Sequence, residues 1–502
     1  MLQTTATSTN ANAARWWFAA VVLLAALPYL GKLGNGFLLW DDVRFIHHDA
    51  AVHSLANLPQ FFSEGTDGLY RPLRRVLYAI SYDAFGFAAK PLGYEIVGLL
   101  LHLLCSVAFF GIARRLTGRL TLAGMAGAIF ATHPVHVERV AGITASYDLL
   151  GDGLLLLAIY LFLDDERASG AWRWATALLA ALFASEMAAV FLPLLVAIDF
   201  VRGKNWRDWV RSRWWAYLLA FALTVGYAAC RFAVLGNLGR GVARPAVGFV
   251  DNLLSVAISY GYYVWFFICP WNVNYFHAIP VAAAGARLSG IIALGGALAL
   301  LVAALVGRRR WPALSIGILW FFICLLPFSQ ILPNNPAFQE RYAYLPLGGF
   351  ALALGAVGET LWRKAATFRR REMLIGGACA GLLLMMTITG SYVRDFRDDL
   401  SLWTRVLQRA PNHAGAANNV GTALMQRGRY AEALPYFDRA HALDPQFTLP
   451  LRNEARTFEA LNRWPEALAA LEQYLALAPQ DRLAAAERER LRARLTPAAS
   501  AQ

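Results

Sequence analysis

Two adjacent carboxylates, Asp41 and Asp42, follow closely on the first apolar run of the sequence. Two acidic groups at the edge of hydrocarbon are unfavourable, and their mutual repulsion tends to raise one of the two pKa values. A carboxylate tuned in this way suits a general base that takes a proton from a hydroxyl group. The structural alternative is that the pair caps a short helix that begins at Val43.

A cationic cluster follows in the same polar stretch. Arg71 stands in the sequence Tyr70-Arg71-Pro72, and Arg74 and Arg75 come directly after it. The planar fork of a guanidinium matches the oxygens of a phosphate group. The cluster therefore indicates phosphate binding, although Arg74 and Arg75 fit equally well on a solvated interfacial helix held by lipid headgroups.

The run from His133 to Glu138 is the third motif with chemical potential. His133, His136 and Glu138 are residue types that bind metal ions. Because Pro134 breaks a helix, the two histidines need not share a face, and a hydrogen-bonded phosphate or sugar site fits at least as well. We predict no cofactor and no metal site from this motif, with a divalent cation as the minor alternative.

Further charged residues stand at the ends of predicted membrane helices, on the side that is expected to carry Asp41 and Asp42. A charge within a membrane span is a functional candidate by default, although snorkelling to water explains many single cases. Convergence favours function, because all of these residues are expected to face one compartment: Asp41, Asp42, Arg71, His133, His136, Glu138, Asp148, Glu186, Glu340, Arg341 and, next to them, Tyr342. Such a cavity suits a lipid-phosphate substrate. No phosphate-binding glycine loop points to a nucleotide.

The composition identifies the elements that must position these residues. Of 502 residues, 58% are hydrophobic and 16% are charged. Soluble chains average roughly 45–50% apolar residues and about 25% charged residues, so a purely soluble enzyme is excluded. The apolar residues gather in runs of about 18 or more, long enough to cross a bilayer as helices. The net charge of +13 comes mostly from basic clusters between these runs, which set orientation and do not indicate nucleic-acid binding.

We therefore predict an all-α polytopic membrane bundle of about eleven spans. The expected domains are a polar leader (1–14), a membrane domain (15–393) whose first outer loop is 34–91, a repeat domain (394–495) and a tail (496–502). The positive-inside rule keeps every basic cluster in the cytoplasm only if the run around Tyr262 is re-entrant or interfacial. The N-terminus is then cytoplasmic, and the repeat domain lies on the other side.

The polar C-terminal part contains an internal repeat. Pro411, Pro445 and Pro479 are each 34 residues apart. Between the first two, small and apolar residues stand at the spacing of a tetratricopeptide repeat: Gly421, Leu424, Gly428, Tyr430, Ala433, Phe437 and Ala440. The pattern predicts two full repeats after a half repeat. Stacked helical repeats of this kind offer concave surfaces for peptides.

In their order, these motifs resemble the transmembrane and tetratricopeptide-repeat O-mannosyltransferases, a family of the GT-C class of glycosyltransferases. The likeness covers about residues 15–480. It rests on the Asp41-Asp42 loop, Tyr70-Arg71-Pro72-Leu73, Gly93-Tyr94 before the helix with His102, His133-Pro134-Val135-His136, Tyr147-Asp148-Leu149-Leu150, Ser185-Glu186 before Leu192-Pro193-Leu194, and Glu340-Arg341-Tyr342-Ala343-Tyr344-Leu345-Pro346.

The resemblance implies a polyprenyl-phosphate-sugar donor and an inverting transfer to a protein hydroxyl, with Asp41 or Asp42 as the base. Arg71, His133, His136 and Arg341 would hold the donor phosphate as its charge develops. Two positions depart from the family pattern, which usually has Lys where this chain has Ser185 and an Arg-Ala-Asp-type run at Ser146-Tyr147-Asp148.

We thus expect a bacterial inner-membrane glycosyltransferase whose repeats bind a periplasmic acceptor protein or peptide. Its partners would be the lipid-linked sugar, this acceptor and membrane lipids, without nucleic acid. One rival keeps the donor but transfers the sugar to a glycan or a lipid. A rival of another class is a non-catalytic membrane scaffold that recruits partners through its repeats.

Overall fold

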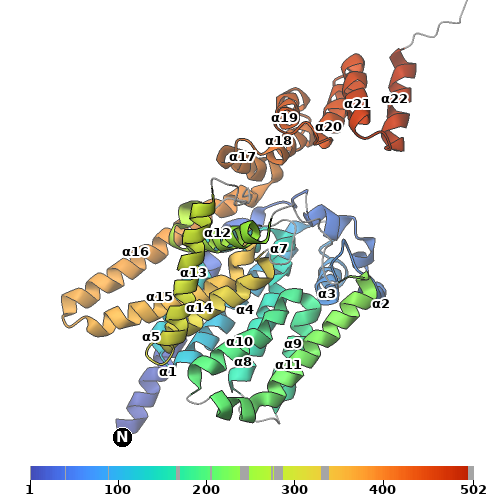
Figure 1. Cartoon of the computed structure of the whole chain (residues 1–502). Helices are drawn as coiled ribbons and strands as arrows, with labels where there is room; N and C mark the ends of the chain where they lie inside the picture. The colour runs from blue at the N-terminus through green and yellow to red at the C-terminus, as the bar shows by residue number, and fades with distance from the viewer. Residues whose placement is uncertain are drawn as a thin grey trace, which may run out of the picture. The chain divides into compact units, whose positions relative to one another are not determined.

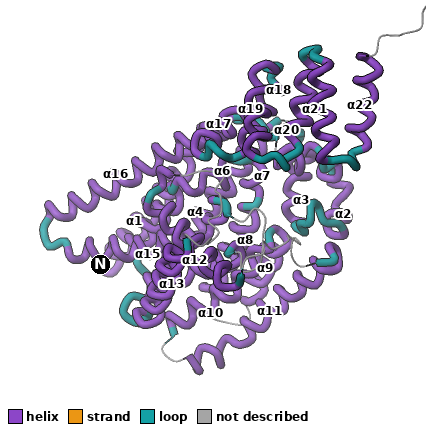
Figure 2. Tube along the Cα trace, turned by 45° about the horizontal axis from the view of Figure 1, so that its top comes forward, coloured by secondary structure: helices purple, strands orange, loops and turns teal. Residues whose placement is uncertain are grey.

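The computed structural model describes residues 2–39, 41–88, 90–164, 170–203, 206–237, 248–272, 275, 286–329 and 338–495. Within these ranges every regular element is a helix (Figure 2). The chain divides into two compact units, Met1–Arg394 and Asp395–Gln502. The predicted tail, 496–502, lies outside the described residues.

Seven helical segments of the first unit are long and apolar enough to cross a membrane. An eighth is possible if α5 (Leu120–Thr132) and the segment 134–141, which are bent by 48° at Pro134, form one broken span. Proline causes such bends because it lacks an N–H donor and clashes with the preceding turn. The seven segments contain α1 (Leu2–Ala26), α4 (Pro91–Thr117), α8 (Leu149–Asp164), α11 (Trp206–Leu235), α13 (Arg287–Gly307), α15 (Tyr344–Lys364) and α16 (Phe368–Val393).

The number of spans expected from the sequence, about eleven, stays a prediction. Several apolar helices of the described ranges do not meet the length or hydropathy of a full span: α9 (Ala171–Ala184), α10 (Phe191–Arg202), α12 (Phe249–Ile268) and α14 (Pro312–Leu325). The run around Tyr262 forms α12, whose tyrosines and Trp265 make it less apolar. Figure 1 shows α12 lying across the direction of α13. Its interfacial or re-entrant placement stays a prediction.

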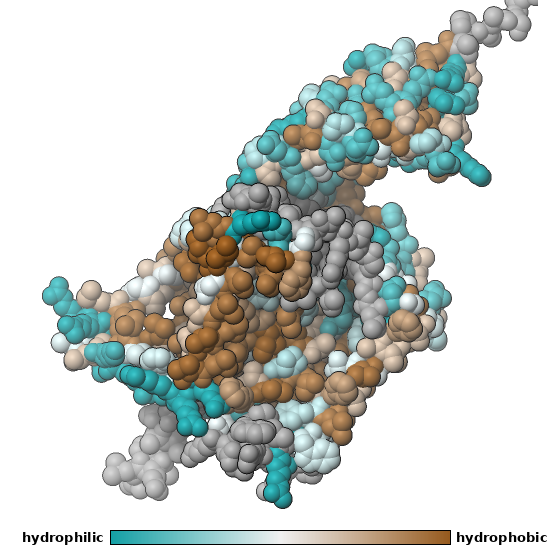
Figure 3. Space-filling model, in the orientation of Figure 1, coloured by the Kyte–Doolittle hydropathy of each residue, from teal (hydrophilic) through white to brown (hydrophobic). Residues whose placement is uncertain are grey.

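Small residues bring the membrane helices into close contact. A Cβ atom on Gly349 of α15 would lie 2.3 Å from the carbonyl oxygen of Gly317 on α14, so neither position has room for a side chain. Close backbone approach of this kind stabilises helix pairs in lipid. The outward faces are apolar, as the hydrophobic surface over α13 and α14 shows (Figure 3). Ile291 and Leu298 of α13 are 59% and 54% exposed, as expected for side chains that face lipid.

The polar stretch after the first span is a packed cap at one end of the bundle. It contains α2 (Leu58–Ser63) and α3 (Pro72–Ala79), joined by turns. Phe45, Ile46 and Phe61 are buried with Tyr94 of α4 in one hydrophobic cluster. Tyr78 of α3 stacks on Tyr147 with 4.7 Å between ring centroids. This core fixes α3, and with it Arg71 and Arg74, against the start of α8.

The second unit is a stack of helices that begins with α17 (Asp399–Arg409). It continues with α18 (Ala414–Gln426), α19 (Tyr430–Leu443), α20 (Leu449–Ala460), α21 (Trp464–Leu477) and α22 (Arg482–Leu495). A Cβ atom on Gly421 would lie 2.6 Å from the ring of Phe437, which explains the small residue at that repeat position. Gly428 ends the α18 turn at a φ of +72°, a conformation that glycine adopts without strain.

Candidate active site

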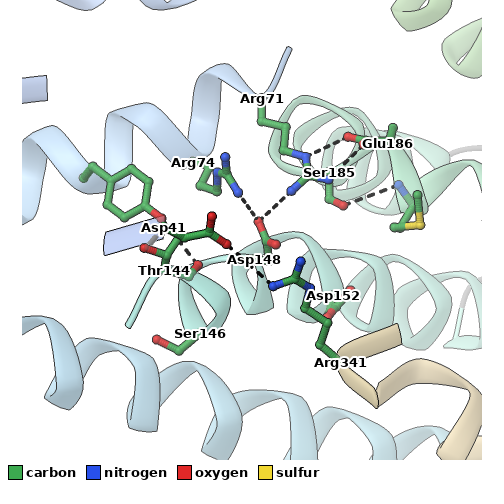
Figure 4. Close-up of polar contacts among 12 residues, drawn as sticks. Asp41, Arg71, Arg74, Thr144, Ser146, Asp148, Asp152, Ser185, Glu186 and Arg341 are labelled. Carbon is green, nitrogen blue, oxygen red and sulfur yellow. Dashed lines mark hydrogen bonds and ion pairs between the residues drawn. The ribbon is translucent and has the colours of Figure 1, made fainter. Parts of the chain in front are cut away.

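Asp148 is the centre of a charged cluster at the start of α8. Its carboxylate accepts hydrogen bonds from Nη1 of Arg71 at 2.8 Å and from Nη1 of Arg74 at 2.7 Å (Figure 4). It also accepts one from Nη1 of Arg139 at 3.1 Å. Arg71 is the N-cap residue of α3, and Arg74 lies in the first turn of that helix. Pro72 begins the helix at a position whose N–H would have no partner within it. Arg139 comes from α6 (Val137–Ala141), beyond the bend at Pro134. Side chains from α3 and α6 therefore meet at one carboxylate at the start of α8.

Glu186 holds Arg71 from the opposite side. Its two carboxylate oxygens accept from Nε and Nη2 of Arg71, both at 2.8 Å. Burial alone would raise the pKa of Glu186, but the charge and hydrogen bonds of Arg71 lower it to about 2. Ser185, the position where the related family usually has Lys, is buried and accepts a hydrogen bond from the Met187 N–H. A Cβ atom on Gly151 would lie 2.5 Å from the Ser185 Cβ, so the local packing is tight.

Arg231 of α11 brings a further buried cation to this cluster. Its side chain is 7% exposed, its Nη1 lies 3.9 Å from Glu186, and its Nε and Nη1 make no hydrogen bond to any described residue. The cluster around Asp148 thus contains four guanidiniums, of Arg71, Arg74, Arg139 and Arg231, against the three carboxylates of Asp148, Asp152 and Glu186. A buried cation without full pairing is costly unless an anion joins it.

The two adjacent aspartates differ in their surroundings. Asp42 is 3% exposed and accepts hydrogen bonds from Leu38 N at 2.9 Å, Thr144 N at 2.8 Å and Thr144 Oγ1 at 2.5 Å. Burial raises the pKa of Asp42, against the lowering effect of these bonds. Asp42 therefore ties the loop to α7 (Ile143–Tyr147). It precedes the helical turn at Val43 but makes no side-chain capping bond there, so the capping interpretation is wrong.

Asp41 is the accessible member of the pair. Its side chain is 31% exposed, and its Oδ2 lies 3.6 Å from Nη1 of Arg341. Figure 4 shows Asp41, Arg341 and Asp148 facing one another. A carboxylate that is held near a cation but not enclosed has room to contact a substrate hydroxyl.

The predicted residues around Arg341 lie in two different environments. Glu138 accepts from the Arg341 backbone N–H at 2.8 Å and lies 3.7 Å from its Nη1. Glu340 is fully buried, at 0% exposure. Tyr342 stacks on Phe328 with 3.9 Å between ring centroids. Arg341 and Glu138 thus adjoin Asp41, whereas Glu340 and Tyr342 pack the loop that carries Arg341.

The two histidines are placed in the protein core, not at the accessible surface of the cluster. His133 accepts from Val135 N at 3.2 Å, and its Nε2 lies 3.1 Å from the Phe267 carbonyl oxygen. His136 is fully buried, with its Nε2 3.3 Å from the Tyr344 carbonyl oxygen. Both nitrogens of His133 are engaged by backbone groups rather than left open to a ligand, and phosphate binding by His133 stays a prediction. The imidazole of His133 caps the turn at Pro134.

The sequence motifs missed three members of the cluster: Arg139, Asp152 and Arg231. Asp152 accepts from Nη2 of Arg139 at 2.8 Å. A buried acidic residue one turn after Asp148 was the available signal for Asp152. Nothing in the sequence singles out Arg231 from other basic residues at helix ends. Among the described residues, no three His, Cys, Asp or Glu side chains gather closely enough to hold a metal ion.

The Arg71–Glu186 pair predicts a pH dependence of stability. Glu186 has a pKa of about 2 in the folded chain, below its ordinary 4.5. Its contribution to stability is therefore complete above pH 4.5 and is lost as the pH falls towards 2. We expect the thermal unfolding midpoint of the wild type to fall more steeply in this window than that of Glu186→Gln.

The matched control is Asp67→Asn, which removes the partly exposed ion pair with Arg44. Exposed pairs contribute little, so this variant should follow the wild-type pH profile closely. Parallel profiles for Glu186→Gln and the wild type would show that Glu186 is not held in its charged form by Arg71.

The chain is similar to known proteins over most of its length. A family model described as tetratricopeptide repeat matches residues 424–495. Protein O-mannosyl-transferase F38B6.6 of Caenorhabditis elegans is 23% identical over 85% of this chain and 62% of its own length. Protein O-mannosyl-transferase Tmtc3 of Drosophila melanogaster is 25% identical over 92% of this chain and 59% of its own length. Human protein O-mannosyl-transferase TMTC4 is 26% identical over 84% of this chain and 66% of its own length.

The chain spans about three fifths of the length of these curated relatives. Among solved structures, the apo oligosaccharyltransferase of Archaeoglobus fulgidus is similar over 75% of this chain and 56% of its own, with 11% identity and a TM-score of 0.46. The sequence matches extend over the membrane unit and confirm the likeness predicted from the motifs. The chain is thus a homologue of the transmembrane and tetratricopeptide-repeat O-mannosyltransferases, with tetratricopeptide repeats in its C-terminal unit.

Proposed function

We propose that this chain is a membrane glycosyltransferase that moves a mannosyl residue from a polyprenyl-phosphate donor to a Ser or Thr hydroxyl of a protein. The observation that carries the proposal is the accessible carboxylate of Asp41 beside a cluster in which guanidiniums outnumber carboxylates around Asp148. This pairing provides a base for a hydroxyl and a binding site for a phosphate. The names of the relatives support the mannosyl group and the protein acceptor.

The reaction that we propose is a single inverting displacement. The acceptor oxygen forms a bond to the anomeric carbon while the bond from that carbon to the phosphate oxygen breaks. The hydroxyl proton passes to Asp41, and the polyprenyl phosphate leaves with the electron pair. A base on the face opposite the leaving group gives inversion. Since phosphate is already a good leaving group, no general acid is required.

Arg341 and Arg231 are the cations that we assign to the donor phosphate. Arg341 is 18% exposed, and the ion pairs of its guanidinium with described residues are long, 3.6 Å to Asp41 and 3.7 Å to Glu138. Within the described ranges, two nitrogens of Arg231 make no hydrogen bond. Arg71, by contrast, bonds a carboxylate with each of its nitrogens. We therefore assign Arg71 to positioning, which refines its predicted role as a phosphate ligand.

The proposal places the site at the periplasmic face of a bacterial inner membrane, with the repeats binding the acceptor. The basic clusters between the spans support this orientation, because such clusters remain on the cytoplasmic side. A peptide-binding groove is what stacked helical repeats offer. If the basic clusters were found on the periplasmic side, the proposal of a periplasmic acceptor would lose its basis.

The direct test is transfer by the purified full-length chain in detergent. We expect incubation with synthetic polyprenyl-phosphate mannose and a Ser/Thr-rich peptide to add one hexose mass to the peptide, as detected by mass spectrometry. Peptides with every Ser and Thr changed to Ala are the control. Transfer to a glycan or lipid acceptor but to no peptide would favour the rival acceptor class, and no turnover of the donor with any acceptor would contradict the enzyme proposal.

A further inference from the structure

A groove of about 940 Å³ lies where α1, α4 and α8 meet, separate from the charged cluster. It is lined mostly by apolar side chains, among them Phe18 of α1, Leu104 of α4 and Leu157 of α8. Those three are 48%, 64% and 40% exposed, so no helix of the described chain covers them. Ala108 and Gly111 lie on the α4 side of the groove, where their small size leaves room.

The lining of the groove runs along most of one helix. Between Leu101 and Gly118 it follows α4 for about 26 Å at 1.5 Å per residue, comparable to much of the hydrocarbon core of about 30 Å. Its volume is in the range of about 300–1,000 Å³ in which proteins bind small molecules. A long apolar furrow along the surface of helices that are apolar enough to cross a membrane is suited to flexible hydrocarbon chains.

Two of the residues that line the groove carry a formal charge. Both are arginines, and both lie at the same end of the groove. Arg114 and Arg115 occupy the last turn of α4, which Gly118 ends at a φ of +65°. Arg115 lies over the ring of Tyr160 at 3.4 Å, and its Nη2 lies 2.9 Å from Asp164. Arg114 is exposed. Arg15 of α1 stands one turn before Phe18 and so extends the basic character of this end.

The two ends of α4 therefore lie in different surroundings. Tyr94, in the first turn of α4, belongs to the packed cap next to the candidate active site. The arginines lie at the other end, where, among the described residues, the exposed carboxylate of Asp164 is paired with Arg115. Lipid chains in the groove would thus place an anionic headgroup at Arg114, where a membrane span meets the water interface.

We propose that this groove binds one anionic phospholipid, whose acyl chains lie against α1, α4 and α8 and whose phosphate contacts Arg114 with Arg115 as its neighbour. Basic pockets between membrane helices favour anionic headgroups, and the apolar walls exclude a water-soluble anion. The lipid is a structural ligand of the membrane unit. The inference is independent of the proposed transfer reaction, because none of its residues belongs to the Asp148 cluster.

The test uses the full-length chain in nanodiscs made from equal amounts of phosphatidylglycerol and phosphatidylcholine. Native mass spectrometry after release from the nanodisc identifies and counts the retained lipids. We expect one retained phosphatidylglycerol per wild-type chain. Arg114→Gln should reduce the preference for phosphatidylglycerol about fivefold, as expected for the loss of one cation near an anionic headgroup. Ala108→Phe should remove the retained lipid by filling the groove.

The matched control is Arg370→Gln, which removes another exposed arginine, in the first turn of α16 and outside the groove. It should leave the retained phosphatidylglycerol unchanged. Equal losses in Arg114→Gln and Arg370→Gln would overturn the proposal in favour of general charge attraction. Retention of phosphatidylcholine in place of phosphatidylglycerol, or retention unaffected by Ala108→Phe, would also overturn it. Displacement of the lipid by added polyprenyl phosphate, but not by added phosphatidylglycerol, would assign the groove to the donor and equally reject it.

Discussion

Replacement of Asp41 with Asn is expected to lower the rate of sugar transfer by at least about 100-fold, the lower end of the contribution of a general base. The amide cannot accept the hydroxyl proton, while its size and its position near Arg341 change little. Because Asp41 is 31% exposed and not enclosed by hydrogen bonds, the variant should keep its fold. The measurement is initial rate with polyprenyl-phosphate mannose and peptide, together with the unfolding midpoint.

The neighbouring Asp42→Asn provides the matched comparison. Asp42 accepts bonds from Leu38 and Thr144, so its replacement removes part of a buried network that fixes the loop. A lost bond to a buried charged group costs about 1.5–3 kcal/mol, and we expect a lower unfolding midpoint in this variant. Full activity of Asp41→Asn, with activity lost only in Asp42→Asn, would reverse the assignment of the base.

The second large effect is expected at Arg71. Arg71→Gln leaves Glu186 without its bidentate partner and Asp148 with one cation fewer. Breaking a buried ion pair from one side costs about 3–5 kcal/mol, because a charge is left without compensation. The variant should therefore unfold at a clearly lower temperature and lose transfer. Arg71→Lys should recover only part of both, since an ammonium group cannot form the two parallel bonds.

The double variant Arg71→Gln/Glu186→Gln separates positioning from folding. Removal of the stranded carboxylate should restore a substantial part of the unfolding midpoint that Arg71→Gln loses. Transfer should remain low, because Asp148 and Arg231 lose the ion pairs with Arg71 and Glu186 that position them. If the two substitutions destabilise additively, the Arg71–Glu186 pair is not a coupled unit, and the positioning role is wrong.

Much of the fold follows from local properties of the sequence. Runs such as 91–117 and 287–307 are long and apolar enough to require a helix in lipid, because every backbone polar group must be bonded internally. The repeat is equally local, since the small residue at Gly421 leaves space for Phe437 only at tetratricopeptide spacing. The number of spans is less determined, because helices such as α12 and α14 are intermediate in length or hydropathy.

The candidate site was only partly predictable. Asp148, Arg71, Glu186 and Arg341 were found because charges are conspicuous in apolar surroundings, and the structure brings all four to one end of the bundle. His133 met the same criterion, but it lies in the core, because a histidine can satisfy its polar atoms with backbone groups of neighbouring helices. Residue type alone does not distinguish these two outcomes.

The sequence by itself determined a helical membrane protein with a repeat domain and a set of charged residues that favour one end of its spans. Only the tertiary structure decided which charges are partners: Asp42 is enclosed by Thr144, Asp41 stays accessible, and Arg231 joins from α11. The physical reason is the separation in sequence over which each kind of interaction acts. Hydropathy and helical period act between neighbours in sequence, whereas an ion pair depends on where segments far apart in the sequence are held by packing.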